Sequence, residues 1–440
     1  MTAKSDPLIT FVTTDYAGIT RGRSVAASTY KSGHGKTLGW VPANISLTPF
    51  DLIADPNPWG SVGDVRLLPD DNAHFKCHIE GSQTPLNIIM SDIVDLDGKP
   101  WACCPRNILK SALADFESET GLSIVTTFEH EFQLFNTGWS SVPSFSLQAL
   151  RQADSFGPQL MAALREAGAE PEVFIAEYGR DQFEVTMAPS GGVVAADRAV
   201  LLREVVRELS RNLGWRSSFA PKTSVDSVGN GVHIHFSFKN KKGKPITYDE
   251  VQPGNVSAVA GSFVAGIIKH LLTLVAFTAP SPISYLRLKP HNWSSSYTWF
   301  GDRDREASLR ICPVNRVGKS DPAKSFNIEY RPADACASPH LALAVLVRAG
   351  LSGIQSQLPP APLFSGDPEL LSAEDRKKRG LHRLPTTLSE ALNNLKTNLE
   401  FVTWFDPLTI EAYIGMKRKE LELAGDNLDD TLCQRYAAIY

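Results

Sequence analysis

Cysteine is scarce in this 440-residue sequence, and its spacing excludes the common cysteine-based sites. The six cysteines are Cys77, Cys103, Cys104, Cys312, Cys336 and Cys433, and no two of them are spaced as Cys-x-x-Cys. Such usage in a long chain is typical of reduced thiols, so we expect neither a disulfide framework nor a zinc site built from cysteines. A cytoplasmic protein is therefore expected.

Long uninterrupted apolar segments and an excess of one charge are also missing. The N-terminus has no charged segment followed by an apolar one, so no signal peptide is expected. The most apolar stretch, residues 258–280, is interrupted by Lys269 and His270 and predicts a buried helix rather than a membrane span. With 44 basic and 48 acidic residues, the chain has no broad attraction for nucleic acid or an anionic membrane.

The sequence does contain enough apolar residues, 42%, to bury a large core, which excludes disorder throughout the chain. In its first hundred or so residues, short β-like segments such as 8–13 and 64–68 alternate with turns at Pro69-Asp70 and at 96–98. A helical pattern follows at 106–120. We place a domain boundary near residue 102, which gives domains 1–102 and 103–440.

Beyond this boundary, strand-like and helical segments alternate. The strand-like segments are 123–135, 182–187, 231–238 and 327–331, and the helical ones are 148–167, 195–213, 255–278, 341–355 and 388–398. Such a pattern indicates an α+β or α/β protein, with an antiparallel or mixed sheet possible.

Carboxylates share one face of the first of these strands. Side chains on a strand alternate between two faces, so Glu129 and Glu131 lie on one face and Phe128 and Phe132 on the other. Two carboxylates side by side repel each other unless a cation neutralises them. A solvated strand face is the alternative interpretation of this segment.

The other strands repeat the pattern. Their polar residues are His233 and His235 in 231–238, Asn327, Glu329 and Arg331 in 327–331, and Glu177 with Glu184 around 182–187. Hard divalent cations such as Mg²⁺ or Mn²⁺ prefer carboxylate oxygens and tolerate a histidine. Five carboxylates and one histidine are too many for one ion that also keeps water ligands. Two or more metal ions are therefore expected, which suits phosphoryl transfer.

Four arginines accompany these acidic strands: Arg287, Arg305, Arg310 and Arg331. A single arginine is more often an inert surface residue. Guanidinium groups nevertheless bind carboxylates and phosphates bidentately, as an acidic substrate and ATP would require. A Walker GxxxxGK[ST] motif is missing, so a nucleotide must be held in another way.

Seven motifs, taken in their order along the sequence, resemble those of the glutamine synthetase family, bacterial type I, over nearly the whole chain. They are Glu129-x-Glu131, Glu177-x4-Gln182-x-Glu184, Pro221-Lys222, Gly229-x-Gly231-x-His233-x-His235, and the segments 284–290 (SYLRLKP), 305–311 (REASLRI) and 328–334 (IEYRPAD). The resemblance implies an α+β fold with an N-terminal β-grasp domain and a catalytic domain whose curved antiparallel sheet forms a funnel. It also implies that ATP phosphorylates the γ-carboxylate of L-glutamate and that an amine then displaces phosphate.

Residue roles are implied by motif position. Glu131, Glu177 and Glu184 resemble the ligands of one metal ion, and Glu129, His233 and Glu329 those of a second. Gly229, Arg287, Arg305 and Arg331 resemble the glutamate-binding residues, with Arg287 and Arg305 also catalytic, and Glu172, His235, Ser237 and Arg310 resemble the ATP contacts. The family builds each site between subunits of stacked six-membered rings. A homo-oligomer, a dodecamer of two hexamers, is thus implied, in which catalytic Asp64 of one subunit reaches the next subunit's amine pocket.

One departure from the family concerns the nucleophile. After the segment 284–290 the family has Gly-Tyr-Glu on a mobile flap, whereas this chain has Trp293 in place of the glutamate. Ammonium needs hydrogen-bond acceptors and negative charge, whereas an organic amine gains from apolar and cation–π contact. We therefore expect an organic amine as nucleophile and a γ-glutamyl amide as product. The alternatives are a changed flap without a change of substrate, glutamine synthesis from ammonium, and a non-catalytic structural or sensor protein.

Overall fold

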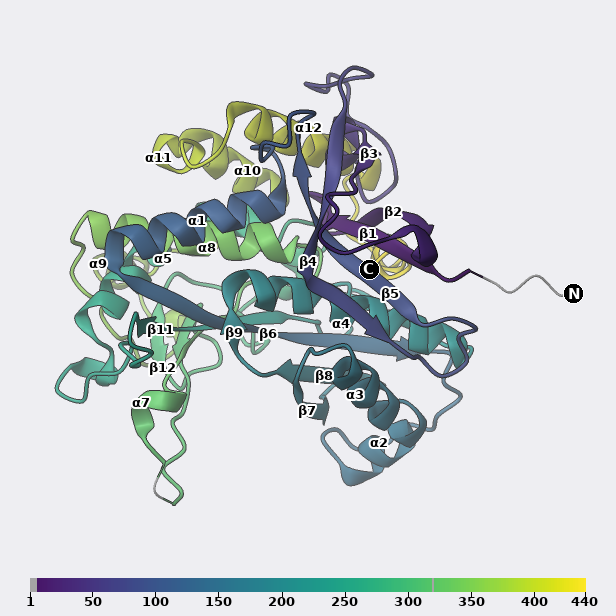
Figure 1. Ribbon diagram of the computed structural model, residues 1–440. Helices are drawn as coiled ribbons and strands as arrows, with labels where there is room; N and C mark the ends of the chain where they lie inside the picture. The colour runs from purple at the N-terminus through teal and green to yellow at the C-terminus, as the bar shows by residue number, and fades with distance from the viewer. Residues whose placement is uncertain (1–5, 319) are drawn as a thin grey trace, which may run out of the picture.

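A computed structural model of the protein describes residues 6–318 and 320–440, and the described chain begins with a mixed five-stranded sheet (Figure 1). Its strands are β1 (Leu8–Thr14), β2 (Thr20–Ala26), β3 (Leu38–Trp40), β4 (Val65–Cys77) and β5 (Leu86–Val94). They lie in the order β2-β1-β5-β4-β3, and β1 and β5 are parallel. The turn expected at Pro69-Asp70 is wrong, because β4 continues through both residues. Its register with β5 shifts between Pro69 and His74, since proline has no N–H to donate to the ladder.

The second sheet contains the strands with the polar residues. They are β6 (Leu122–Phe135), β7 (Pro171–Ala176), β8 (Gln182–Met187), β9 (Ser190–Gly191), β10 (Arg216–Ser218), β11 (Val232–Asn240), β12 (Phe300–Asp302), β13 (Leu309–Ile311) and β14 (Ile328–Tyr330). The main order is β12-β13-β14-β11-β6-β8-β7, and β9 and β10 pair with β6. Neighbours are antiparallel except β12 and β13, which are parallel. The expected α+β class is confirmed.

Helices supply the other layer of the fold. They are α1 (Pro105–Thr120), α2 (Leu147–Gln152), α3 (Gly157–Glu166), α4 (Gly192–Asn212), α5 (Ala258–Thr278), α6 (Ser284–Arg287), α7 (Pro322–Ser325), α8 (Pro339–Gln355), α9 (Ala373–Lys378), α10 (Leu388–Thr397), α11 (Leu399–Val402), α12 (Pro407–Ala424) and α13 (Asp430–Ala437). The single helix expected at 148–167 is wrong, since a 3₁₀ turn at Ala153–Ser155 separates α2 from α3. Pro158 lies in the first turn of α3. N–H groups in the first turn of a helix have no acceptor within the helix, so a proline is tolerated there and favours the start of a new helix.

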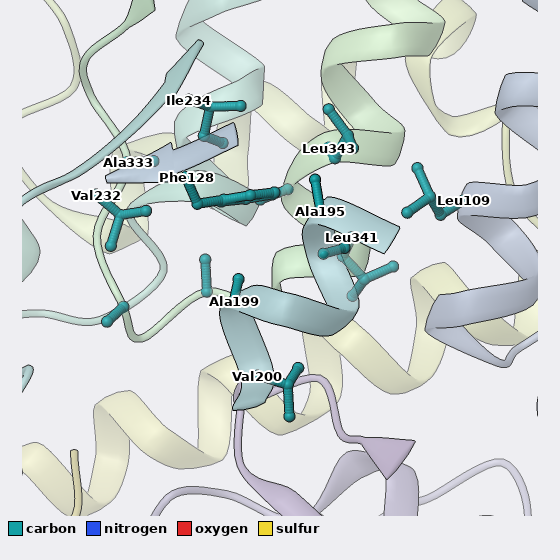
Figure 2. Packing of buried hydrophobic residues seen from close by; sticks show 14 of the residues in the cluster. Leu109, Phe128, Ala195, Ala199, Val200, Val232, Ile234, Ala333, Leu341 and Leu343 are labelled. Carbon is teal, nitrogen blue, oxygen red and sulfur yellow. The ribbon is translucent and has the colours of Figure 1, made fainter. Parts of the chain in front are cut away.

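The apolar faces of β6 and β11 pack against helices. Figure 2 shows Phe128, Val232 and Ile234 of these strands near Ala195 and Ala199 of α4 and Leu341 and Leu343 of α8. Phe128, Phe132, Ile234 and Phe236 are all at most 3% exposed. The alternation expected from the sequence is confirmed, and the polar side chains of the same strands therefore occupy the opposite face.

The long apolar helix α5 lies in the interior, as expected. By length and composition it could cross a membrane, but 61% of its most apolar window is buried. It packs on α8 so closely that a Cβ atom on Gly266 would lie 2.1 Å from the carbonyl oxygen of Ala349. Lys269, one of the two polar residues that interrupt it, forms an ion pair with Glu400 at 2.6 Å.

A buried ion-pair network connects the N-terminal sheet to the helices. Arg106 is 2% exposed and donates to Asp70 of β4, Asp92 of β5 and Asp197 of α4, with shortest distances of 2.8 Å in each case. Burial by itself raises the pKa of Asp197, but His340 and Arg106 hold it below its usual range. One guanidinium group thus neutralises acids from both parts of the chain.

Replacing Arg106 by methionine should lower the free energy of unfolding by about 3–5 kcal/mol, because Asp197 would keep a buried charge that has lost its partner. Arg151→Met is the matched control, since the Arg151–Asp154 pair is exposed and such pairs contribute about 0–1 kcal/mol. Denaturant-induced unfolding of both variants measures the difference. Equal losses in the two would contradict a stabilising role for the network.

Candidate active site

The register of four neighbouring strands brings most of the predicted metal ligands together. Glu129 of β6 lies opposite His233 of β11, and Glu131 of β6 lies opposite Glu184 of β8. On the other side of β11, His235 lies opposite Glu329 of β14. Directly opposite residues on one sheet face have their Cβ atoms about 5 Å apart. The strand pairing therefore gathers these side chains on the face turned away from the helices.

The side chains of β6, β11 and β14 converge further. Nδ1 of His233 lies 3.6 Å from Glu129 and 3.4 Å from Glu329, and Nε2 of His235 lies 3.2 Å from Glu129. Possible ligand atoms of Glu129, Glu184 and His233 all lie within 4.8 Å of one another. This donor set of carboxylates with one imidazole fits a hard divalent cation such as Mg²⁺ or Mn²⁺.

The remaining predicted ligand, Glu177, lies on the hairpin between β7 and β8. Its N–H donates to the carbonyl oxygen of Gln182 at 2.8 Å. Burial raises its pKa to about 7, with a further contribution from the charge of Glu131. Glu177 therefore belongs electrostatically to the same cluster as the strand residues.

The carboxyl groups of the cluster have opposed pKa shifts. Burial and the charges of Glu129 and Glu131 raise the pKa of Glu184 to about 9. Burial alone would also raise the pKa of Glu329, but Arg331 and His233 hold it at about 2. Repulsion between carboxylates is therefore strongest at the β6–β8 side of the cluster, which is where bound cations would relieve it.

Arg287 approaches the cluster through a glycine-lined loop. Its Nη2 donates to the carbonyl oxygens of Pro332 and Ala333 at 2.7 Å. A Cβ atom on Gly229 would lie 2.6 Å from Cγ of Arg287, and one on Gly231 would lie 3.2 Å from its Nη1. Larger residues at these two positions would displace the guanidinium group. The N–H of Gly231 also donates to Glu131 at 2.5 Å.

Two other predicted arginines contact a metal-ligand candidate directly. Arg310 of β13 donates to Oε2 of Glu329 at 2.9 Å, and Arg331 donates to Oε1 of the same carboxylate. Arg331 also donates to the carbonyl oxygen of Arg305 at 2.9 Å. Arg305 itself is exposed, and its charge lowers the pKa of Glu177. The four predicted arginines thus lie around the acidic cluster.

Some predicted site residues lie at the margin of the acidic cluster or outside it. Ser237 is partly buried on β11, two residues beyond His235, and Trp293 is 69% exposed on the loop between α6 and β12. Glu172 is exposed on the edge strand β7, three positions from β11 in the sheet order. Asp64 is exposed just before β4. The strand pairing within one chain does not bring Glu172 or Asp64 to the cluster.

Sequence reasoning missed Cys312 and Gln182 as site residues. The Sγ atom of Cys312 lies 3.5 Å from Nδ1 of His235 and 3.8 Å from Glu329. Its position two residues after Arg310 was the available signal, because such residues share a strand face. Gln182 donates to the carbonyl oxygen of Gly229 at 2.9 Å and so ties the glycine loop to the Glu177 hairpin.

Divalent cations should bind more tightly as the pH rises from about 6 to about 8. Because the folded-state pKa of Glu184 is raised, its carboxyl group carries a proton across this range, and binding must displace that proton. Each displaced proton changes the affinity by up to about tenfold per pH unit. Titration calorimetry with Mn²⁺ in buffers of different ionisation enthalpy measures how many protons are released on binding. Glu184→Gln should reduce this number of protons. Binding that is independent of pH would contradict a ligand role for the cluster.

Comparison with known proteins places the chain in a family. The model of the glutamine synthetase N-terminal domain matches residues 2–101, and that of the glutamine synthetase catalytic domain matches residues 102–436. The chain is 33% identical over 425 residues to the gamma-glutamylpolyamine synthetase GlnA3 of Streptomyces coelicolor. The aligned region covers 94% of this chain and 90% of that protein.

Two further relatives agree with this result. The chain is 32% identical over 310 residues to the glutamine synthetase of Pyrococcus furiosus. The aligned region covers 68% of this chain and 67% of that protein. The crystal structure of a novel glutamine synthase homolog has a TM-score of 0.92 and 43% identity, with 100% of both chains covered. The chain therefore belongs to the glutamine synthetase family and is an ATP-dependent γ-glutamyl ligase.

Proposed function

We propose that this ligase joins the γ-carboxylate of L-glutamate to an organic amine. A γ-carboxylate oxygen attacks the terminal phosphorus of ATP, which gives ADP and a γ-glutamyl phosphate. The amine nitrogen then attacks the acyl carbon, the amide bond forms, phosphate leaves and the nitrogen loses a proton. The observation that carries the proposal is Trp293, an exposed indole at the position of the family's flap glutamate. The name of the Streptomyces relative, a gamma-glutamylpolyamine synthetase, supports the same class of nucleophile.

The acidic cluster holds the cations in this proposal. Glu131, Glu177 and Glu184 bind one metal ion, and Glu129, His233 and Glu329 bind a second. When bound, these ions neutralise charge on the transferred phosphoryl group. Support comes from the pairing of Glu131 with Glu184 and of Glu129 with His233 across neighbouring strands.

The arginines orient the two anionic substrates. Arg287, Arg305, Arg331 and the backbone at Gly229 bind glutamate, and Glu172, His235, Ser237 and Arg310 bind ATP. Arg287 and Arg305 also stabilise charge as the phosphoryl group moves to the carboxylate. Arg287 is 5% exposed and Arg331 3% exposed, so both act in surroundings where a charge-assisted hydrogen bond is strong.

Assembly completes the site in our proposal. Asp64 is exposed and precedes β4 of the other sheet, so we place it in the amine pocket of a neighbouring subunit, beside Trp293. Stacked six-membered rings provide this neighbour. We also propose a cytoplasmic location without nucleic-acid or membrane partners, which the free, buried cysteines support.

Glutamine synthesis from ammonium is the second candidate. The name of the Pyrococcus relative favours it, and so does Glu306, whose carboxylate accepts the N–H of Trp293 at 2.6 Å. Negative charge is thus retained close to the altered flap. The two candidates share every step except the identity of the attacking nitrogen.

Phosphate release with glutamate, ATP and Mg²⁺ should be faster with at least one organic amine than with ammonium. An informative panel contains alkyl, aryl and hydroxyalkyl amines and polyamines at equal concentration, with a reaction lacking glutamate as the control. Faster turnover with ammonium than with every amine would reject the organic-amine proposal. No turnover with any nucleophile, from protein that binds ATP and metal, would support the non-catalytic alternative.

Exchange of Trp293 for glutamate should raise kcat/KM for ammonium relative to the preferred amine, on the order of tenfold, since one charge-assisted hydrogen bond is regained. Trp293→Gln is the matched control, because it removes the indole without adding charge. Both variants should lose affinity for the amine, and only the glutamate variant should gain ammonium use. Equal behaviour of the two would show that the charge at this position does not select the nucleophile.

A further inference from the structure

The loop that presents Trp293 has an unusual backbone. His291 has φ 61° and Trp293 has φ 50°, which places two bulky residues in the left-handed region that favours glycine. Such conformations persist only where surrounding contacts hold them, and they concentrate at ligand-binding segments. The contacts of this loop therefore show what keeps Trp293 in place.

A single carboxylate holds both of these residues. Oε1 of Glu306 accepts the N–H of Trp293 at 2.6 Å, and Oε2 accepts the N–H of His291 at 3.2 Å. Glu306 is partly buried on the segment between β12 and β13. Hydrogen bonds from backbone N–H groups to an ionised carboxylate are among the stronger ones in proteins. Both oxygens of Glu306 thus act on the backbone of one turn.

The other side of the turn is attached to the acidic cluster. Nη2 of Arg331 donates to the carbonyl oxygen of Trp293 at 3.0 Å, while its Nη1 donates to Glu329. The backbone of Trp293 is therefore fixed at its N–H by Glu306 and at its carbonyl by Arg331. One arginine side chain separates this tryptophan from a candidate metal ligand.

The flanks of the turn are also anchored. Nε2 of His291 lies 2.9 Å from Asp367, and the hydroxyl of Ser294 donates to the carbonyl oxygen of Arg287 at 2.5 Å. The side chain of Trp293 nevertheless remains 69% exposed. A fixed backbone that presents an exposed aromatic ring offers a ligand an accessible surface for apolar and cation–π contact.

We propose that Glu306 is a positioning residue that sets amine selectivity by clamping the 291–293 turn, so that the indole of Trp293 lies over the approach of the nucleophile. The inference rests on the proposed function, because it assigns the indole to an amine with an apolar body. Such an amine gains apolar and cation–π contact only if the ring is held in one place. Displacement of a binding group by about 1 Å can cost as much as 100-fold in rate.

The test compares Glu306→Ala and Glu306→Gln with Asp302→Asn as the matched control. Asp302 is an acidic residue of the same region, 44% exposed, whose ion pair is with the neighbouring Arg303. Alanine removes both acceptors, whereas glutamine keeps one carbonyl oxygen. Two properties are measured: hydrogen exchange of the amides of His291 and Trp293, and KM for the amine, for glutamate and for ATP.

In Glu306→Ala, the amides of His291 and Trp293 should exchange at least about tenfold faster, and KM for the amine should rise on the order of tenfold. KM for glutamate and for ATP should change much less. The exchange rates and the KM for the amine of Glu306→Gln should lie between those of Glu306→Ala and wild type. Asp302→Asn should resemble wild type in every measurement.

Unchanged exchange of the two amides in Glu306→Ala would overturn the clamp. Equal rises in KM for all three substrates, together with a lower melting temperature, would overturn the selectivity role and leave a merely structural one. Failure of the proposed function is distinguishable, because it appears in the wild-type protein as faster turnover with ammonium than with any amine. The exchange measurement still decides whether Glu306 holds the turn in that case.

Discussion

Carboxylates crowd the polar face of the second sheet, and their mutual repulsion shapes the candidate site. The apolar faces of β6 and β11 must face the helices, and the pleat then places Glu129, Glu131 and His233 together on the other face. Glu184 is buried beside them, and burial together with the charges of Glu129 and Glu131 raises its pKa to about 9. A protein that only needed to fold would gain from replacing these residues. In the proposed function, divalent cations relieve this repulsion and support phosphoryl transfer.

The arginines divide this cluster into two unequal halves. Arg310 and Arg331 form ion pairs with Glu329, whereas burial and neighbouring carboxylates raise the pKa values of Glu177 and Glu184. Arg331 also extends the network outward, through the carbonyl oxygen of Trp293, to the loop clamped by Glu306. One guanidinium group thus contacts both a proposed metal ligand and the loop of the proposed amine pocket. The family's chemistry needs both positions to be fixed at the same moment.

Local pattern was sufficient to predict the strands of the site, because alternation of Phe128-Glu129-His130-Glu131-Phe132 already assigns each side chain to a face. Which strands are neighbours could not be read from periodicity, since register depends on long-range pairing. The motif resemblance implied only which residues would share a metal ion. The continuation of β4 through Pro69 and the break before α3 were missed because a proline fits more than one local structure: an irregular point of a strand, a turn, or the first turn of a helix. The clamp by Glu306 was also beyond prediction. Its partners are backbone N–H groups, and these leave no trace in residue type.

Anomalous X-ray diffraction from crystals grown with Mn²⁺ and a non-hydrolysable ATP analogue tests the central claim most directly. We expect at least two anomalous peaks on the polar face of the sheet, one among Glu131, Glu177 and Glu184 and one among Glu129, His233 and Glu329. Peaks confined to other parts of the molecule, or no peak within bonding distance of these six side chains, would contradict it.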